Sequence, residues 1–148
     1  GNDIWIGAWS GVYVYSKSSP QLKNSIEFGQ KLFPELMLRI TSMKKYDDAI
    51  YIACNVGIVK YSVNSSEWEL IINAVQYQNK SIHSLEIKNN NVFLGTLDGL
   101  VKINKKTGSM KEYYFPFIGK VNEMVLLDNI LWLGTSNGLI KFKWKTGI

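Results

Sequence analysis

The segment LWLGTSNGLIKF at residues 131–142 decides the fold of this chain. It consists of an aliphatic–aromatic–aliphatic run, two small residues, two variable residues, a glycine and a second apolar run. The first run is typical of a β-strand, and the glycine supplies the positive φ that a tight hairpin turn requires. The segment therefore predicts a strand–turn–strand unit.

The same pattern occurs three more times without gaps, as IWIGAWSGVYVY at 4–15, IYIACNVGIVKY at 50–61 and VFLGTLDGLVKI at 92–103. The turn glycines recur at intervals of 46, 42 and 39 residues and are Gly11, Gly57, Gly99 and Gly138. A second recurring position takes only a very small residue, which indicates a crowded place in the strand. Its members are Gly7, Ala53, Gly95 and Gly134.

Further strands are expected on both sides of each hairpin. A short segment with an apolar residue at each end precedes the last three hairpins, at residues 40–43, 82–85 and 121–124. Weaker strands follow two of them, at 67–71 and 111–115. Four strands in a repeat of about 40 residues are typical of a β-propeller blade, so we predict an all-β propeller with four-stranded antiparallel blades.

The chain is predicted to be a single propeller segment over residues 1–148, with four blades at about 1–36, 37–77, 78–117 and 118–148. The first blade lacks its inner strand and the last lacks its outer strand. Three explanations remain open: a fragment of a larger propeller, which we favour, completion by a second copy through exposed strand edges, or a small four-bladed ring.

Composition and charge exclude several classes of protein. The net charge is +5, and its excess lies in residues 100–148, where lysines alternate with apolar residues, which favours a solvated sheet face over an anion-binding one. The apolar runs are shorter than the roughly 20 residues of a membrane span, and no segment has the charged start, apolar middle and small-residue cleavage site of a signal peptide, which says nothing about the location of the parent protein. The single cysteine, Cys54, excludes an intrachain disulfide, and no zinc spacing exists. We expect Cys54 to be a small buried residue, and we expect no metal or cofactor.

The residues Val121, Met124, Asp128-Asn129, Leu131-Trp132-Leu133-Gly134-Thr135 and Gly138-Leu139 together resemble the two-component regulator propeller repeat. The third copy is close to this repeat, whereas the second departs most, with Ala53 and Cys54 in place of glycine and threonine. The resemblance implies a periplasmic sensor region of a bacterial hybrid histidine kinase, and a ligand such as an oligosaccharide. Similar repeats also occur in secretion-system components and other scaffolds.

In such a blade, the turn between the second and third strands shares a face with the start of the innermost strand. This turn face is predicted to carry the ligand-binding residues Trp9, Arg39, Thr41, Asn55, His83, Asp98, Asn122 and Asn137. Three of these, Thr41, His83 and Asn122, take equivalent positions near the expected central channel. The alternative is that they satisfy one another or water.

The tryptophans are expected to differ in role. Trp9 lies at a turn tip, where it either offers an exposed ring to a sugar or partner, or packs on a neighbouring blade. Trp5 and Trp132 take the aromatic position of the repeat and are predicted to be core. Trp68 and Trp144 lie on outer strands.

Three functions compete. A ligand-sensing module uses the turn face. An interaction scaffold binds a protein partner through Trp9 or the lysine-rich surface. Nucleic acid is not an expected partner. Association with a membrane is expected only through other parts of the parent protein. An enzyme needs converging acids, and only Asp98 and Glu123 qualify, so we expect no catalysis by this segment.

Overall fold

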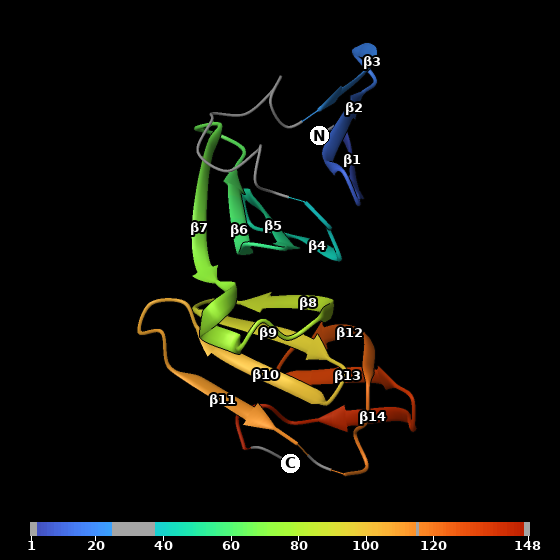
Figure 1. The fold of residues 1–148 in the computed structure, drawn as a ribbon, viewed down its shortest axis with the longest axis vertical. Helices are drawn as coiled ribbons and strands as arrows, with labels where there is room; N and C mark the ends of the chain where they lie inside the picture. Colours follow the sequence, from blue (N-terminus) through green and yellow to red (C-terminus); the bar gives the residue numbers. More distant parts are fainter. Residues whose placement is uncertain (1–2, 25–37, 115, 147–148) are drawn as a thin grey trace. The chain divides into compact units, whose positions relative to one another are not determined.

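The computed structural model describes residues 3–24, 38–114 and 116–146, and nearly all of its regular structure is β-strand (Figure 1). The strands form four separate antiparallel sheets, each built from strands that are consecutive in sequence. The chain divides into two compact units, unit 1 over residues 1–76 and unit 2 over residues 77–148. The predicted boundary between the first two blades, near residues 36–37, lies outside the described residues.

Unit 1 contains two of the sheets. The first has the strand order β1-β2-β3, with β1 Asp3–Ala8, β2 Gly11–Ser16 and β3 Ser19–Asn24. The second has the order β4-β5-β6-β7, with β4 Ser42–Tyr46, β5 Ala49–Cys54, β6 Gly57–Ser62 and β7 Glu67–Asn73. A 3-10 helix, η1, follows at Ala74–Tyr77.

Unit 2 contains the other two sheets. The third sheet has the order β11-β10-β9-β8, with β8 Ile82–Lys88, β9 Asn91–Thr96, β10 Gly99–Asn104 and β11 Met110–Tyr113. The fourth has the order β12-β13-β14, with β12 Val121–Leu127, β13 Ile130–Thr135 and β14 Gly138–Phe142. The propeller-like, all-β architecture agrees with the prediction, whereas the number of blades in a closed ring stays a prediction.

The four predicted hairpin turns are confirmed by their backbone conformation. The glycine that ends each turn has a positive φ, with values of 130°, 138°, 136° and 112° at Gly11, Gly57, Gly99 and Gly138. The polar turns before the second strand of the last three repeats also contain a residue with positive φ, in the left-handed α region that asparagine and aspartate tolerate better than most other residues. Their φ values are 51°, 54° and 55° at Asp47, Asn89 and Asp128.

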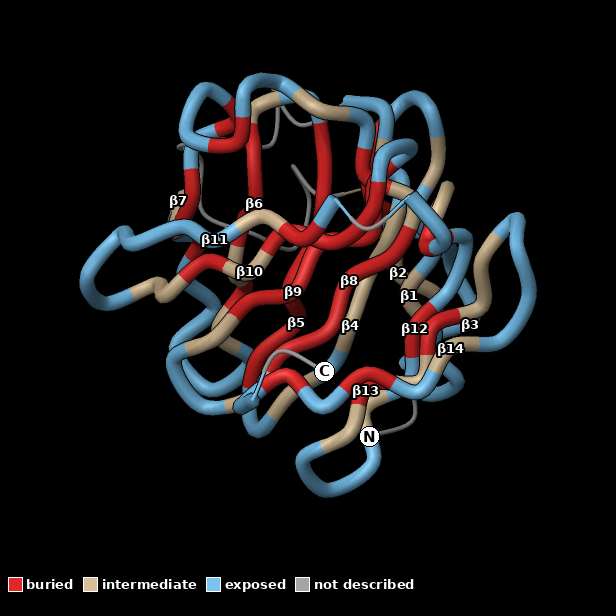
Figure 2. The backbone as a smooth tube through the Cα atoms, turned by 90° about the horizontal axis from the view of Figure 1, so that it is seen from below, coloured by how far each residue is buried: buried red, intermediate tan, exposed pale blue. Residues whose placement is uncertain are grey.

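Burial is greatest on the central strands of the two four-stranded sheets. Every residue of β5 is buried, and only Asn91 of β9 is not, so both strands are covered on both faces (Figure 2). Cys54 ends β5 and is buried, as predicted, and burial raises the pKa of its thiol. Near the end of the chain three lysines are exposed and alternate with the buried aromatic residues Phe142 and Trp144, so they lie on the outer side of the last sheet, and the choice between a solvated and an anion-binding face stays a prediction. The three lysines are Lys141, Lys143 and Lys145.

The small-residue position is crowded in two sheets and open in a third. A Cβ built on Gly7 would lie 2.5 Å from Cγ2 of Ile40, and one on Gly95 would lie 2.8 Å from Cγ1 of Val121. In both cases the space is taken by a side chain at the start of the following sheet. The prediction is wrong for Gly134, where the nearest described atom, the carbonyl oxygen of Glu123, is 3.7 Å away.

The tryptophans of the repeat also contact neighbouring sheets to different extents. Trp5 packs on the second sheet, with its ring 5.0 Å from that of Tyr61. Trp132 takes the equivalent position, and both tryptophans are half-buried, so neither is fully buried in the core as predicted. Trp68 and Trp144 are buried.

In the described part of the chain, no helix is both long and apolar enough to cross a membrane.

Candidate functional site

Trp9 is the most exposed large aromatic side chain of the candidate set. It lies in the turn between β1 and β2, and 73% of its surface is accessible. The backbone N–H of Arg39 donates to the carbonyl oxygen of Trp9 at 2.9 Å, and the Arg39 guanidinium carbon lies 5.4 Å from the centre of the indole ring. The indole is therefore held in place from one side by a cation–π contact while its other surface remains free for a ligand.

The other candidates of unit 1 gather at the same end of its sheets. Thr41 is exposed, and its N–H donates to the carbonyl oxygen of Ala53 at 3.0 Å. Asn55, in the turn between β5 and β6, accepts the N–H of Leu38 on its side-chain oxygen at 2.7 Å and donates its own N–H to the Leu38 carbonyl at 3.1 Å. Asn55 thus fixes the segment that carries Arg39, and it acts as a positioning residue.

A hollow of about 200 Å³ lies beside this group. Its lining is Gly7, Ile40, Thr41, Ser42 and Met43. The hollow is bounded by the segment that begins β4, and the neighbouring residues Ala8 and Trp9 accept the N–H groups of Ile40 and Arg39. Thr41 lines the hollow, and Trp9 and Arg39, which are not part of its lining, lie close to the lining residues Gly7 and Ile40 in the chain. A hydroxyl, an indole and a guanidinium at one end of the sheets are a combination that suits a polyhydroxylated ligand.

Three of the four hairpin turns, all except the one at Ala8, have a side-chain hydrogen bond that the sequence pattern did not reveal. The hydroxyl of Thr96 donates to the carbonyl oxygen of Gly99 at 3.1 Å and accepts the N–H of Asp98 at 3.2 Å. Thr135 makes the same pair of bonds at 2.9 Å and 3.1 Å in the last hairpin. The thiol of Cys54 makes the weaker form, at 3.5 Å to the carbonyl oxygen of Gly57. A hydroxyl at this position therefore closes the turn.

In unit 2, His83 is half-buried at the start of β8, and Nε2 has no hydrogen-bond partner among the described residues. Burial lowers the pKa of His83, and the nearby Lys120 ammonium lowers it further. Asn122 is exposed at the bulge of β12 between Val121 and Glu123. Glu123 is also exposed, and its carboxylate accepts the N–H of Met124 at 3.0 Å.

The remaining two candidates lie in exposed turns. Asp98 is in the turn between β9 and β10. Asn137 is in the turn between β13 and β14, and its side-chain nitrogen donates to the carbonyl oxygen of Phe117 at 3.0 Å. The backbone N–H of its neighbour Ser136 donates to the carbonyl oxygen of Lys120 at 3.0 Å, and the Ser136 hydroxyl accepts the backbone N–H of Lys120 at 3.2 Å. Convergence of Thr41, His83 and Asn122 on one channel stays a prediction.

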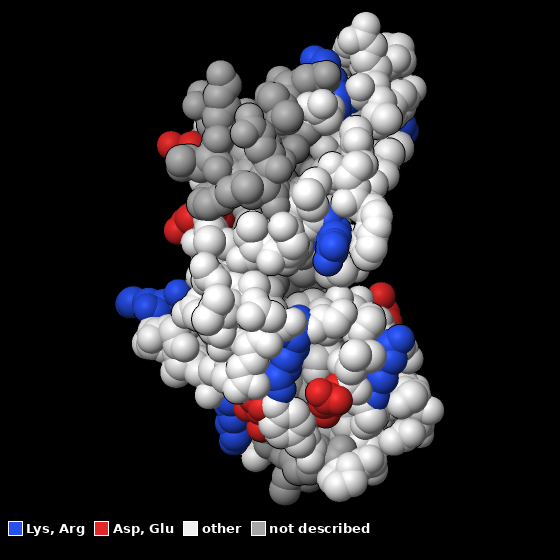
Figure 3. All heavy atoms as spheres, viewed as in Figure 1, with Lys and Arg blue, Asp and Glu red and all other residues white. Residues whose placement is uncertain are grey.

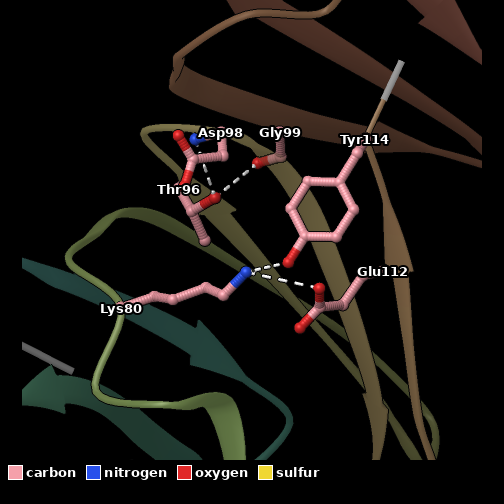
Figure 4. A network of polar contacts seen from close by, with 6 residues as sticks. All are labelled: Lys80, Thr96, Asp98, Gly99, Glu112 and Tyr114. Carbon is pink, nitrogen blue, oxygen red and sulfur yellow. Dashed lines mark hydrogen bonds and ion pairs between the residues drawn. The ribbon is translucent and has the colours of Figure 1, made fainter. Parts of the chain in front are cut away.

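A second polar group in unit 2 was missed by the sequence analysis (Figure 4). The Lys80 ammonium lies 3.3 Å from a carboxylate oxygen of Glu112 and donates to the Tyr114 hydroxyl, with the Tyr114 ring centre 4.4 Å away. Only 14% of the Lys80 side chain and 17% of the Glu112 side chain are accessible. The pair ties the loop before β8 to the outer strand β11. These positions have no equivalent in the repeat pattern, so no periodic signal could have found them.

A larger hollow of about 360 Å³ lies at the other end of the second sheet, next to the turn between β4 and β5. Its lining includes Tyr46, Asp47, Asp48, Tyr51 and Lys60. None of the predicted ligand-binding residues lines this second hollow.

In the described residues no group of histidine, cysteine or acidic side chains is arranged to hold a metal ion. On the face shown in Figure 3, basic and acidic side chains of unit 2 are interspersed.

Comparison with known proteins connects this fold to extracellular domains. No family model and no curated protein matches the chain. Solved structures do match. The extracellular domain of BT4673 from B. thetaiotaomicron, a hybrid two component system, is 26% identical with a TM-score of 0.65 over 95% of this chain. A second BT4673 structure gives 19% identity and a TM-score of 0.73 over 99% of the chain.

The extracellular domain of BT3049, a hybrid two component system of the same organism, is 18% identical with a TM-score of 0.63 over 99% of the chain. The chain spans about a fifth of these domains, 19% and 20% of the two BT4673 chains and 19% of the BT3049 chain. The likenesses below 25% identity show the fold alone. Together they show that this chain shares the fold of these extracellular domains.

Proposed function

We propose that this chain is part of a ligand-sensing propeller in a bacterial two-component signalling protein, that it lies in the periplasm, and that it binds an oligosaccharide without catalysis. The observation that carries the proposal is the exposed Trp9 indole, held by Arg39 beside the recess that Thr41 lines. The likeness to extracellular domains of hybrid two component systems supports it.

The chemistry of the recess supports a sugar in particular. The free face of an indole stacks on the C–H face of a pyranose ring, while the Arg39 guanidinium and the Thr41 hydroxyl are suited to ring hydroxyls. Because Asn55 fixes the segment that carries Arg39, the recess is preformed and little ordering entropy is lost on binding.

The test is a binding screen of the chain against defined neutral and acidic oligosaccharides, followed by titration calorimetry on each hit. Trp9→Ala is expected to weaken binding by tenfold or more, because a buried aromatic anchor contributes about 2 kcal/mol. Leu22→Ala is the matched control, since Leu22 is also an exposed apolar residue of unit 1 but lies on β3. Equal binding by Trp9→Ala and the native chain would refute the assignment of the site.

A non-catalytic interaction scaffold is the second candidate. It is favoured by the exposed lysines of the last sheet, Lys141, Lys143 and Lys145, which offer a basic surface to an acidic partner. Binding of such a partner would weaken steeply with salt, whereas binding of a neutral sugar at Trp9 would be nearly independent of salt. The salt dependence of binding therefore separates the two functions.

A further inference from the structure

The backbone that carries Arg39 is fixed by both sheets of unit 1. On the side of the first sheet, the N–H of Arg39 donates to the carbonyl oxygen of Trp9 at 2.9 Å. On the side of the second sheet, Asn55 accepts the N–H of Leu38 at 2.7 Å and donates its own N–H to the Leu38 carbonyl at 3.1 Å. The point from which the Arg39 side chain extends is therefore set before any ligand arrives.

Arg39 also has a backbone conformation that is costly for its residue type. Its φ is 54°, in the left-handed region that residues other than glycine, asparagine and aspartate seldom adopt. Among the described residues, the others with positive φ, glycines aside, are Asp47, Ser66, Gln78, Asn79, Asn89 and Asp128. Arg39 is the only cationic residue in that set. Strain of this kind persists where the surrounding structure imposes it, and it is concentrated at binding sites.

The guanidinium of Arg39 is exposed and has no carboxylate partner among the described residues. The described acidic residues of unit 1 start or precede strands at the other end of the sheets, or pair with Lys60. They are Asp3, Asp47, Asp48, Glu67 and Glu69. Asp3 lies about 17 Å along β1 from the end next to Trp9, well beyond the Debye length of about 8 Å at physiological salt. The positive charge of Arg39 is therefore uncompensated by these acids.

The Lys80 group of unit 2 shows what a compensated cation looks like in this chain (Figure 4). Lys80 also lies over an aromatic ring, that of Tyr114, but Glu112 neutralises it at 3.3 Å and only 14% of the Lys80 side chain is accessible. Arg39 over Trp9 is the same pair of groups without the carboxylate. A guanidinium that stacks on a ring keeps its N–H donors at its edge, where an anion can bind them.

We propose that the ligand of the Trp9 site is an oligosaccharide with uronic acid residues, and that Arg39 selects it by binding a carboxylate; this assignment rests on the proposed function and names the class of sugar. The carboxylate accepts two parallel N–H bonds from the guanidinium, a geometry that the planar fork of arginine matches. A sugar ring of the same chain stacks on the free surface of the indole. A neutral sugar offers hydroxyl groups alone, which the guanidinium binds less strongly.

The experiment is titration calorimetry of the chain with a panel of uronic acid oligosaccharides, each paired with its methyl ester, so that the two members differ only in charge. We expect the acid to bind about tenfold or more tightly than its ester, and the difference to shrink between about 0.05 M and about 0.5 M salt. Arg39→Gln is expected to bring the two affinities to within about threefold of each other. Arg39→Lys keeps the charge but loses the fork, so an intermediate preference is expected.

The controls separate charge from folding. Glutamine tolerates the backbone of residue 39, since Gln78 has a φ of 58° in this chain, and an unchanged urea midpoint together with retained binding of the ester shows that Arg39→Gln is folded. Lys17→Gln makes the same change of charge in the exposed turn between β2 and β3, at the other end of unit 1, and is expected to leave the preference for the acid unchanged.

The outcomes distinguish this proposal from the proposed function. An ester that binds the native chain as tightly as the acid overturns the selection by Arg39 and leaves a sugar site at Trp9 standing. A preference for the acid that survives in Arg39→Gln, or is lost in Lys17→Gln, overturns it in the same way. A native chain that binds neither member of any pair overturns this proposal, and if it also binds none of the other sugars, it overturns the proposed function.

Discussion

Glycine to alanine substitutions at two equivalent positions test how the sheets pack. Gly95 and Gly134 take the same place in the repeat, on β9 and β13, and both belong to unit 2. Gly95→Ala would put a methyl 2.8 Å from Cγ1 and 3.1 Å from Cβ of Val121. Gly134→Ala would put it 3.7 Å from the nearest described atom. The two substitutions therefore add the same group to a filled and to an open space.

The expected magnitudes follow from this difference. The Ser84 hydroxyl, 2.2 Å from the added methyl at Gly95, can rotate away, but Val121 is fully buried and β-branched, so it can move only with its strand. Overpacking of this kind costs about 1–3 kcal/mol, whereas alanine in place of glycine within a strand gains about 0.5–1 kcal/mol. We expect Gly95→Ala to lose about 1–2 kcal/mol of unfolding free energy and Gly134→Ala to gain about 0.5 kcal/mol.

The assay is urea unfolding, followed by far-UV circular dichroism, with thermal melting as a second measurement. Each kcal/mol shifts Tm by about 4–8 °C in a unit of this size, so the two variants are expected to differ by several degrees. Because both residues lie in unit 2, they report on the same unfolding transition. Equal shifts for the two variants would refute the argument that the following sheet sets the size limit at this position.

Three further predictions concern the turns and the polar groups. Gly138→Val is expected to lower the unfolding free energy by about 1–3 kcal/mol, because valine does not tolerate a φ of 112°, and a native urea midpoint would contradict this. Lys80→Met is expected to cost about 1–3 kcal/mol, because Glu112 is left largely buried without its cation; an unchanged Tm would rule this out. The pKa of His83 is lower in the folded chain than the unfolded-state pKa of about 6.5, because burial disfavours the protonated imidazole. Its neutral form therefore contributes stability above pH 6.5, and this contribution is lost as the pH falls below that value. His83→Gln is expected to flatten this pH dependence of the urea midpoint, and an unchanged pH dependence would contradict it.

Most of the local structure could be predicted from the sequence because it depends on residues close together in the chain. The hairpins require a glycine with positive φ at a fixed place, and the four turn glycines occupy it. The alternation of lysines with Phe142 and Trp144 indicated which side of the last sheet faces water, and the exposure of these residues agrees. The sequence placed Trp9 at a turn tip but left open whether its ring is exposed or packed, and the structure shows it exposed.

The candidate site was only partly predictable. Trp9, Arg39, Thr41 and Asn55 do gather at one end of the sheets of unit 1, because the topology of the hairpins requires it. The Lys80–Glu112 pair was missed, because residues 32 positions apart on a loop and an outer strand have no periodic relation. The hydroxyl bonds of Thr96 and Thr135 were likewise hidden, since the sequence identifies only a small residue at that position.

The sequence alone determined the strands, the turns and the repeat, because these depend on backbone conformation and on the alternation of side chains within about 40 residues. Tertiary structure alone decided which equivalent residues are buried. Gly95 and Gly134 are identical in their local pattern, yet one is crowded and the other is open. Leu100 and Leu139 likewise differ, at 1% and 71% exposure. The reason is physical: burial depends on whether another sheet covers the residue, and no local pattern encodes that.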